Sequence, residues 1–354
     1  MKKRIDGHLV SPRAKLIREI QKQPLRAAFH VQAADDHGDL HNNAGTKFLR
    51  ADYSGVRPNR NDAHIPIDNL QKRYTVFTAK LPFDNFNQRG ESVNYVNELE
   101  FAQRTALDAG VLLLDFFGKA QEVEQKSRTD FRTRADREAD LLIRGRIEKY
   151  YPLDAINSEE LDAKETGSQR RWIVDPLDGT TGFVLGDWNF CVAIGLAVNG
   201  KMVLGVIYCP KRETCYWAAA HTPAIALIIG RGCTAIRVSD EINLNRAIIA
   251  LEPGKAPGRE RKADMERRLL ADDGARISLT WASAAVSLAA VAAGNLDGFV
   301  GHKLEPWDMA AAVPILLEAG AKVTNIAGEP WQIGDESIVA ANPALHDQIL
   351  RRIN

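Results

Sequence analysis

The chain has 354 residues, 45% of them hydrophobic, which is enough to bury a substantial core in one large domain or two modest ones. Its 46 basic side chains balance its 46 acidic ones, which excludes a global field that would draw it to a nucleic acid polymer or an anionic membrane. No apolar stretch approaches the roughly twenty residues that span a bilayer, and no apolar segment follows the basic N-terminus as a secretory signal requires, so we expect a cytoplasmic protein.

The first 96 residues differ in composition from the rest. All six tryptophans lie at or beyond Trp172, and residues 30–60 are rich in Asn, Asp, His and Gly without a sustained apolar period. Such a segment cannot bury enough surface to offset the entropy that it loses on ordering. We therefore expect a largely disordered extension over 1–96, apart from a short helix at about 14–21, and a domain over 97–354. A regulatory or partner-binding tail is the alternative for the extension.

Helical periodicity begins near residue 98. Apolar residues recur every three or four positions from Leu99 to Phe117, which predicts an amphipathic helix to about residue 121. A second helix carries Ala139, Leu142, Ile143 and Ile147 on one face and ends before residue 152. Short apolar runs at 171–174, 190–198 and 202–209 predict strands, with a hairpin turn at 199–200 between the last two.

The second half interleaves strands and helices without a regular repeat. We expect strands at 248–251 and 298–300, and helices at 259–270, 283–293 and 309–319. These elements predict layers of helices on mixed or antiparallel sheets, in two lobes at about 97–235 and 236–354. The cysteines lack zinc-type spacing and lie in or beside apolar segments, so we expect buried free thiols at Cys191, Cys209, Cys215 and Cys233.

Acidic side chains stand at the ends of the apolar elements. In the densest group, an apolar strand leads into Asp175 and Asp178, three residues apart, and then into Gly179 and Thr180. Carboxylates that share a site repel one another, so such a group implies a cation or raised pKa values, and oxygen ligands without a nearby histidine favour Mg²⁺ over zinc. Each acid taken singly can also be read as a helix cap or a turn residue. The other acidic groups are Asp130 and Asp136 around Thr133, the pair Glu159–Glu160, and Asp308.

These motifs resemble the signatures of the inositol monophosphatase family, the lithium-sensitive, Mg²⁺-dependent phosphatases. The central signature corresponds to 172–181 and the second to 306–311 with 318–320, while 126–136 and 157–160 match the upstream motifs. The resemblance spans about 97–354 with the motifs in family order. It implies an αβαβα sandwich and a phosphomonoesterase that acts on a small phosphorylated metabolite with two or three Mg²⁺ ions per site. Family members are often dimers, and the apolar helices are compatible with a homodimer.

The resemblance also implies a role for each matched residue. One metal ion would be held by Glu159, Asp175 and the backbone carbonyl of Leu177, and the second by Asp175, Asp178 and Asp308. Gly179 and Thr180 would bind the substrate phosphate through backbone N–H groups. Thr180 and Asp136 would orient and deprotonate the attacking water, supported by Thr133 and Asp130. The chemistry is consistent, because water on Mg²⁺ is more acidic than bulk water and a neighbouring carboxylate can accept its proton.

The positions expected to contact the rest of the substrate depart from the family pattern. Gly301 stands where inositol-specific members carry a glutamate that contacts ring hydroxyls, and Ser283 and Ala284 begin a helix that can offer N–H groups to a ligand. Lys303 could pair with a second phosphate. Inositol monophosphate is the default substrate, and histidinol phosphate, 3′(2′),5′-bisphosphate nucleotides and fructose 1,6-bisphosphate are alternatives. A catalytically silent protein that binds a phosphorylated metabolite is the hypothesis from another class.

Overall fold

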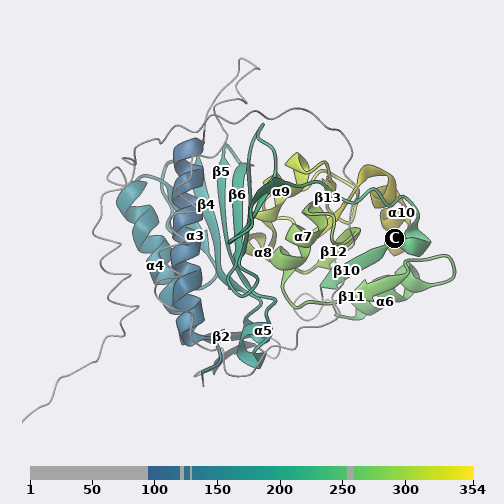
Figure 1. The fold of residues 1–354 in the computed structure, drawn as a ribbon, viewed down its shortest axis with the longest axis horizontal. Coiled ribbons are helices and arrows are strands. Elements are labelled where there is room, and N and C mark those ends of the chain that lie inside the picture. Colours follow the sequence, from purple (N-terminus) through teal and green to yellow (C-terminus); the bar gives the residue numbers. More distant parts are fainter. Residues whose placement is uncertain (1–94, 120–122, 128–129, 253–258) are drawn as a thin grey trace, which may run out of the picture. The chain divides into compact units, whose positions relative to one another are not determined.

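Helices and sheets alternate in layers over the part of the chain that the computed structural model describes, residues 95–119, 123–127, 130–252 and 259–354 (Figure 1). Helices α3 (Val96–Phe116) and α4 (Arg134–Tyr150) cover one face of a seven-stranded sheet. Helices α7 (Ala284–Ala292) and α9 (Ala312–Glu318) separate this sheet from a five-stranded one. Helices α6 (Arg259–Leu270) and α10 (Pro343–Ile353) pack on the other face of the five-stranded sheet. This order is the αβαβα sandwich that the sequence predicts.

The seven-stranded sheet has the order β3-β4-β5-β6-β7-β8-β9, and its strands are antiparallel except for the pair β3 and β4. The predicted hairpin between β5 and β6 is confirmed, since Asn199 and Gly200 have φ values of 51° and 74°. The strands are β3 (Ala155–Ser158), β4 (Arg170–Asp178), β5 (Cys191–Val198), β6 (Lys201–Cys209), β7 (Thr214–Ala219), β8 (Ile225–Ile228) and β9 (Gly232–Ala235).

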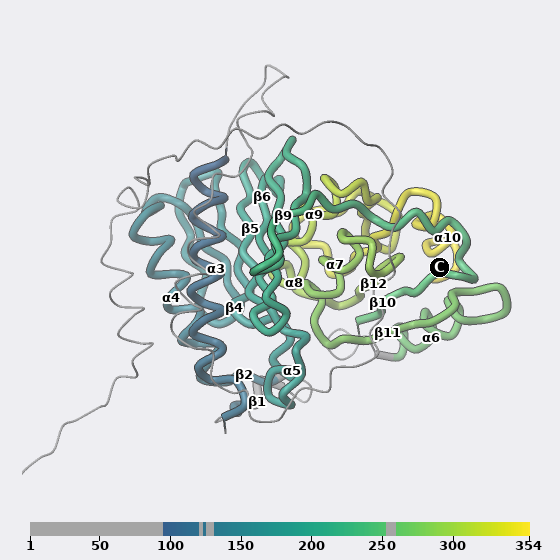
Figure 2. Tube along the Cα trace, in the orientation of Figure 1, coloured from purple at the N-terminus to yellow at the C-terminus, as the bar shows by residue number. Residues whose placement is uncertain are grey.

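The five-stranded sheet is mixed and has the order β11-β10-β12-β14-β13. Strand β10 runs parallel to β11 and β12, whereas β14 runs antiparallel to β12 and β13. The strands are β10 (Ile248–Glu252), β11 (Ile277–Leu279), β12 (Gly298–His302), β13 (Lys322–Thr324) and β14 (Ser337–Ala341). A separate two-stranded hairpin, β1 (Val123–Ser127) and β2 (Asp130–Thr133), lies beside the short helix α5 (Thr180–Leu185), as the tube in Figure 2 shows.

Two predicted helices differ in extent from those observed. The first helix ends at Phe116 rather than near residue 121, because the chain leaves the helix through Gly118, which has a left-handed φ of 73°. The helix predicted over 309–319 is two helices, α8 (Pro306–Met309) and α9. Pro314 lacks the N–H that an unbroken helix would direct to the carbonyl of residue 310, so it is tolerated only in the first turn of a new helix.

Two glycines in the seven-stranded sheet allow the segment between α8 and α9 to approach the strands closely. Gly195 of β5 and Gly205 of β6 are register partners, and both are buried. A Cβ atom on Gly205 would lie 1.8 Å from the carbonyl oxygen of Ala311, and one on Gly195 would lie 3.4 Å from the Cα of Ala311. The backbone at Ala311 therefore rests directly on the sheet, which fixes the height of α8 above it.

All four cysteines are free, and Cys191, Cys209 and Cys215 are buried as predicted. The prediction is wrong for Cys233, which is exposed because β9 is the edge strand of its sheet and all four of its residues face solvent. The helix expected at about 14–21 lies outside the described residues. Within the described ranges, no helix combines the length and the apolar character needed to cross a membrane.

Candidate active site

Three carboxylates from two layers of the fold meet at one point. Asp175 and Asp178 come from the C-terminal part of β4, and Asp308 comes from α8, which packs against β4. One carboxylate oxygen from each lies within 4.8 Å of the others. Asp175 and Asp178 are buried and Asp308 is half-buried. A group of oxygen ligands this close together is suited to a hard divalent cation.

Asp175 stands at the centre of the negative charge. Burial raises its pKa well above the ordinary value, and the charges of Glu159, Asp178 and Asp308 raise it further. Its Oδ1 accepts a hydrogen bond of 3.0 Å from the backbone N–H of Leu177, which opposes this shift. The metal-free site therefore favours a proton on this carboxyl group, and a bound cation would compete with that proton.

Asp178 is held in place by the beginning of α7. Its Oδ2 accepts hydrogen bonds from the Ser283 hydroxyl at 2.5 Å and from the Ala285 N–H at 2.8 Å. The Cys191 thiol lies 3.7 Å from the same oxygen. Burial raises the pKa of Asp178, while the bonds from Ser283, Ala285 and Ala284 lower it. Ser283 and Ala284, predicted as specificity residues, thus contact a carboxylate of the cluster in this structure.

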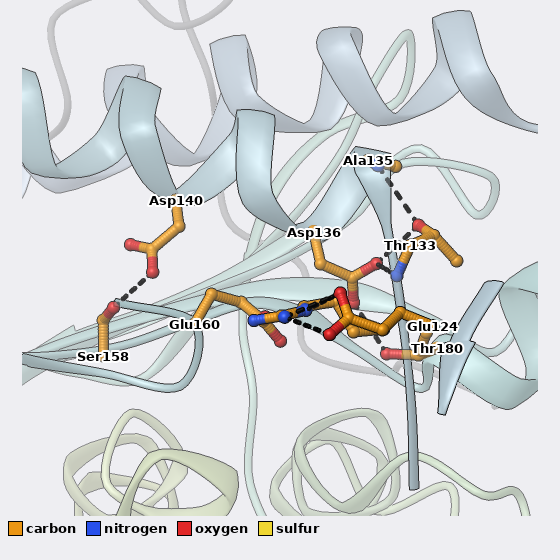
Figure 3. A network of polar contacts seen from close by, with 9 residues as sticks. Glu124, Thr133, Ala135, Asp136, Asp140, Ser158, Glu160 and Thr180 are labelled. Atoms are coloured by element: carbon orange, nitrogen blue, oxygen red, sulfur yellow. Dashed lines mark hydrogen bonds and ion pairs between the residues drawn. The ribbon is translucent and has the colours of Figure 1, made fainter. Parts of the chain in front are cut away.

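Thr180, two residues after Asp178 of the cluster, forms a hydroxyl–carboxylate pair with Asp136 (Figure 3). Thr180 begins α5, and its Oγ1 donates to Asp136 Oδ1 at 2.9 Å or to the Leu177 carbonyl at 3.1 Å, since a hydroxyl has one proton. Asp136 Oδ2 accepts from both the N–H and the hydroxyl of Thr133, which caps α4. Burial raises the pKa of Asp136 although these hydrogen bonds oppose the rise. The structure thus brings together the predicted residues Asp136, Thr133 and Thr180.

Glu159 and Glu160 follow β3, at the same edge of the sheet as Asp175. The negative charge of Glu159 raises the pKa of both Asp175 and Asp136, so it lies near each of them. Glu160 is buried, and Arg132 lies 3.6 Å from its Oε2 while also binding Glu124. Arg132 thereby offsets one charge of the pair, whereas Glu159 adds to the field at the cluster. The side chain of Asp130 is not among those that the structure describes.

Gly179 and Thr180, the predicted phosphate-binding residues, form the turn between β4 and α5. Gly179 has φ 88°, and a Cβ atom there would lie 2.5 Å from the carbonyl oxygen of Asn189 and 3.1 Å from Cβ of Ser283. Only glycine satisfies both the left-handed conformation and this close approach. The first N–H groups of a helix lack acceptors within the helix, so those that follow Gly179 can bind a ligand.

Gly301, the third predicted specificity residue, lies on β12 as the register partner of Glu252 on β10. A Cβ atom on Gly301 would lie 2.4 Å from Leu304 Cδ1 and 2.8 Å from Phe299 Cε1, so apolar side chains fill the space beside it. Lys303 pairs with Glu336 at the surface. His302 is half-buried, and burial together with the positive charges of Arg261 and Lys303 lowers its pKa.

Two features near the cluster were not anticipated from the sequence. Glu252 is buried at the end of β10, where its Oε1 accepts from the Trp281 N–H at 3.3 Å. The Ser287 hydroxyl, which has one proton, donates either to this Oε1 at 3.2 Å or to the Ser283 carbonyl at 2.8 Å. Burial and the charge of Asp178 raise its pKa to about 7. The sequence carried a signal here, because an acid that ends an apolar strand before a proline occurs at both Asp175 and Glu252. The second feature is Arg212, whose guanidinium lies over the Trp281 ring at 4.8 Å.

The fold and the site define a class of protein, a layered α/β protein with an acidic cation site beside a hydroxyl–carboxylate pair. Comparisons agree with this class. Residues 95–354 match the sequence model of the Inositol monophosphatase family. A "Fructose-1,6-bisphosphatase/inositol-1-monophosphatase" of Aquifex aeolicus is 33% identical over 263 residues, which cover 73% of this chain and 96% of that protein. The inositol-1-monophosphatase of Bacillus subtilis is 31% identical over 266 residues, covering 72% and 96%.

Solved structures show the same likeness. The extragenic suppressor protein suhB from Bartonella henselae aligns with a TM-score of 0.68 at 31% identity, covering 73% of this chain and 98% of that one. The IMPase of Thermotoga maritima aligns with a TM-score of 0.65 at 31% identity, covering 73% and 97%. This chain belongs to the inositol monophosphatase family, and it is a phosphoric monoester hydrolase.

Proposed function

We propose that this phosphatase hydrolyses a small phosphomonoester with Mg²⁺, and that inositol monophosphate is the default substrate. One observation carries the proposal, the convergence of Asp175, Asp178 and Asp308 within 4.8 Å of one another. The donor set fits the metal, because it consists of carboxylate oxygens, and because burial raises the pKa of both Asp175 and Asp178, so that a bound cation would offset the cost of their negative charge. Sequence motifs alone support the wider set of ligands, which adds Glu159 and the carbonyl of Leu177.

The ligands divide into two groups that share one residue. Glu159, Asp175 and the Leu177 carbonyl would hold one ion, and Asp175, Asp178 and Asp308 a second. Bound Mg²⁺ would lower the pKa of water and neutralise charge on the transferring phosphoryl group. The protein's contribution is to keep the carboxylates in position, and Ser283 and Ala285 do this for Asp178 through their hydrogen bonds.

The pair Thr180–Asp136 is suited to accept the proton of the attacking water. When the Thr180 hydroxyl donates to Asp136 Oδ1, its lone pairs remain available to accept a hydrogen bond from water. As the oxygen of that water forms its bond to phosphorus, the bond between phosphorus and the ester oxygen breaks. The proton of the water passes to Thr180 Oγ1, the hydroxyl proton passes to Asp136 Oδ1, and the departing alkoxide takes a proton from solvent water to leave as the alcohol. The raised pKa of Asp136 makes it a better base than a solvated aspartate. The N–H groups at Gly179 and Thr180 would bind the phosphate oxygens.

The names of the relatives support more than one substrate, since they include inositol-1-monophosphatases and a fructose-1,6-bisphosphatase/inositol-1-monophosphatase. A phosphate-release assay with Mg²⁺ tests the proposal directly. Its arms are inositol 1-phosphate, histidinol phosphate, a 3′,5′-bisphosphate nucleotide and fructose 1,6-bisphosphate, each with and without Li⁺. We expect turnover of inositol 1-phosphate that requires Mg²⁺ and is inhibited by Li⁺. If no substrate exceeds a generic aryl phosphate, the substrate assignment fails even where the metal requirement holds.

We further propose that residues 1–96 are an extension to the catalytic domain and that the enzyme is a cytoplasmic homodimer. The match of the family model to residues 95–354 supports the first statement. The four free cysteines fit a reducing compartment, and the resemblance to a family whose members are often dimers motivates the homodimer. Light scattering of the full chain and of a 95–354 fragment, with activity measured for both, tests the oligomeric state and the role of the extension. A monomer with full activity would contradict the dimer.

A further inference from the structure

An arginine is fixed beside the active site in a position that the proposed chemistry does not use. Arg212 lies in the turn between β6 and β7 and is half-buried. Its guanidinium stands over the Trp281 ring, 4.8 Å from the centroid, and its Nη2 donates to Asn189 Oδ1. Stacking and a hydrogen bond together hold the plane of the guanidinium, which is the arrangement that presents its remaining N–H groups in a defined direction.

Both residues that hold Arg212 adjoin the catalytic residues. The carbonyl oxygen of Asn189 lies against Gly179, at the position where a Cβ atom would come within 2.5 Å of it. Trp281 lies two residues before Ser283, which donates to Asp178, and the Trp281 N–H is itself fixed by Glu252. Arg212 therefore lies between the turn at Gly179, which is proposed to bind phosphate, and the segment that carries Ser283, whose hydroxyl holds the proposed metal ligand Asp178.

Arg212 is not neutralised by the protein around it. Among the residues that the structure describes, no carboxylate forms an ion pair with Arg212, and its one hydrogen-bond acceptor is a neutral amide. The adjacent Lys211 also lies over aromatic rings, those of Phe117 and Trp188 at 5.0 Å from each centroid, but an ammonium lacks the planar fork that makes two parallel hydrogen bonds. A half-buried guanidinium that retains free donors is suited to a bidentate contact with a phosphate or a carboxylate.

Strand β12 carries no side chain of its own at Gly301, the position that the family resemblance associates with substrate contact. Apolar atoms of Leu304 and Phe299 occupy the space beside Gly301. Lys303, which the sequence analysis suggested as a partner for a second phosphate, is exposed and forms an ion pair with Glu336. Arg212 is therefore the better candidate for contact with the part of the substrate that leaves as the alcohol.

We propose that Arg212, held by Trp281 and Asn189, binds an anionic group on the alcohol part of the substrate, so that this enzyme favours phosphomonoesters with a second anion. The inference rests on the proposed phosphatase function and narrows its substrate class. A second phosphate and a carboxylate share the chemistry that a guanidinium recognises, and substrate pairs that differ by one anion distinguish them.

The test uses the full chain and two matched substrate pairs. Fructose 1-phosphate and fructose 1,6-bisphosphate differ by a phosphate, and glycerol 3-phosphate and 3-phosphoglycerate differ by replacement of a CH₂OH group with a carboxylate. For wild type we expect kcat/KM to favour the anionic member of at least one pair. In Arg212→Gln this ratio should fall about 30-fold, mainly through KM, since a charged hydrogen bond contributes roughly 1.5–3 kcal/mol. Arg212→Lys should lie between the two, because lysine keeps the charge without the planar fork.

Lys303→Gln is the matched control, because it removes a nearby cation that Glu336 already pairs, and the ratio should stay within about twofold of wild type. The inference is overturned if Arg212→Gln lowers both members of each pair equally, or if wild type prefers neither anionic member. If Arg212→Gln does not fold, the same comparison in Arg212→Lys decides. Absence of any phosphate release from wild type would instead refute the proposed function, so the two failures are distinguishable.

Discussion

Replacement of Asp175 by Asn should stabilise the metal-free protein while it abolishes the response to Mg²⁺. Asn keeps an Oδ1 acceptor for the Leu177 N–H and removes one negative charge. At an effective dielectric constant of about 20, two unit charges 4.8 Å apart repel by roughly 3.5 kcal/mol, and Asp175 faces Asp178 and Asp308 at that distance or less. Because Asn removes a charge that burial and these neighbours disfavour, but adds an amide that must find its own hydrogen-bond partners, we expect a smaller net gain of about 2 kcal/mol in the free energy of unfolding.

Thermal unfolding in EDTA and across a Mg²⁺ titration at pH 8 measures both effects. In EDTA the Asp175→Asn protein should unfold at a temperature about 5 °C higher than wild type. Wild type should gain about 2.7 kcal/mol when Mg²⁺ reaches a hundredfold excess over its Kd, and the variant should gain almost nothing. Mg²⁺-dependent phosphate release should be lost in the variant.

Asp108→Asn is the matched control, because Asp108 is also a buried aspartate but pairs with Arg146. Removing its charge leaves a buried cation uncompensated, so this variant should lose about 3–5 kcal/mol whether or not Mg²⁺ is present. An Asp175→Asn protein that is less stable than wild type in EDTA, or that keeps the Mg²⁺ response, would refute the reasoning that burial and mutual repulsion together make the charge on Asp175 unfavourable.

Three further changes test separate parts of the site. Thr180→Val should lower kcat at least about 100-fold with little change in the Mg²⁺ response of thermal unfolding, whereas Thr180→Ser should retain most of the rate, as steady-state kinetics will show. Because the folded-state pKa of Glu252 is raised to about 7, the stability that it contributes is full below its unfolded pKa and should fall by roughly 3 kcal/mol as pH rises from about 4.5 to about 7. Urea unfolding of the metal-free protein should show this slope, and it should be smaller in Glu252→Gln; an unchanged slope would assign the titration to another group. Ala282→Gly should add about 1 kcal/mol to the unfolding free energy, since Ala282 has φ 55°, and a loss of stability would show that this conformation is not strained.

The sequence correctly predicted elements that have a long hydrophobic periodicity or clear turn residues at their ends. Helix α6 was predicted to the residue at 259–270, and the hairpin at Asn199–Gly200 followed from its turn residues. Helix α5 was not anticipated, because six residues are too few to show a helical period. Strand β14 and helix α10 were not anticipated, although Asn342 before Pro343 is a capping signal, and in the structure Asn342 Oδ1 accepts from the Leu345 N–H.

The acidic residues of the site could be read from the sequence because each ends or begins an apolar element, and such positions are fixed locally. Local pattern does not give the partners that hold them. The Ser283–Asp178 hydrogen bond joins residues 105 positions apart, and the stacking of Arg212 on Trp281 depends on packing between elements from both halves of the chain. Gly301 illustrates the same limit, since the sequence shows a missing side chain but not that Leu304 and Phe299 fill the space.

The lack of side chains at Gly195 and Gly205 helps to position one of the proposed metal ligands, Asp308. Asp308 belongs to a short helix whose height above the sheet is set where Ala311 meets Gly205 and Gly195. A single methyl group added at Gly205 would lift that helix and carry Asp308 away from Asp175 and Asp178. The affinity for the proposed cation should therefore depend partly on glycines that contact no ligand, and a search for loss-of-function variants confined to acidic residues would overlook them.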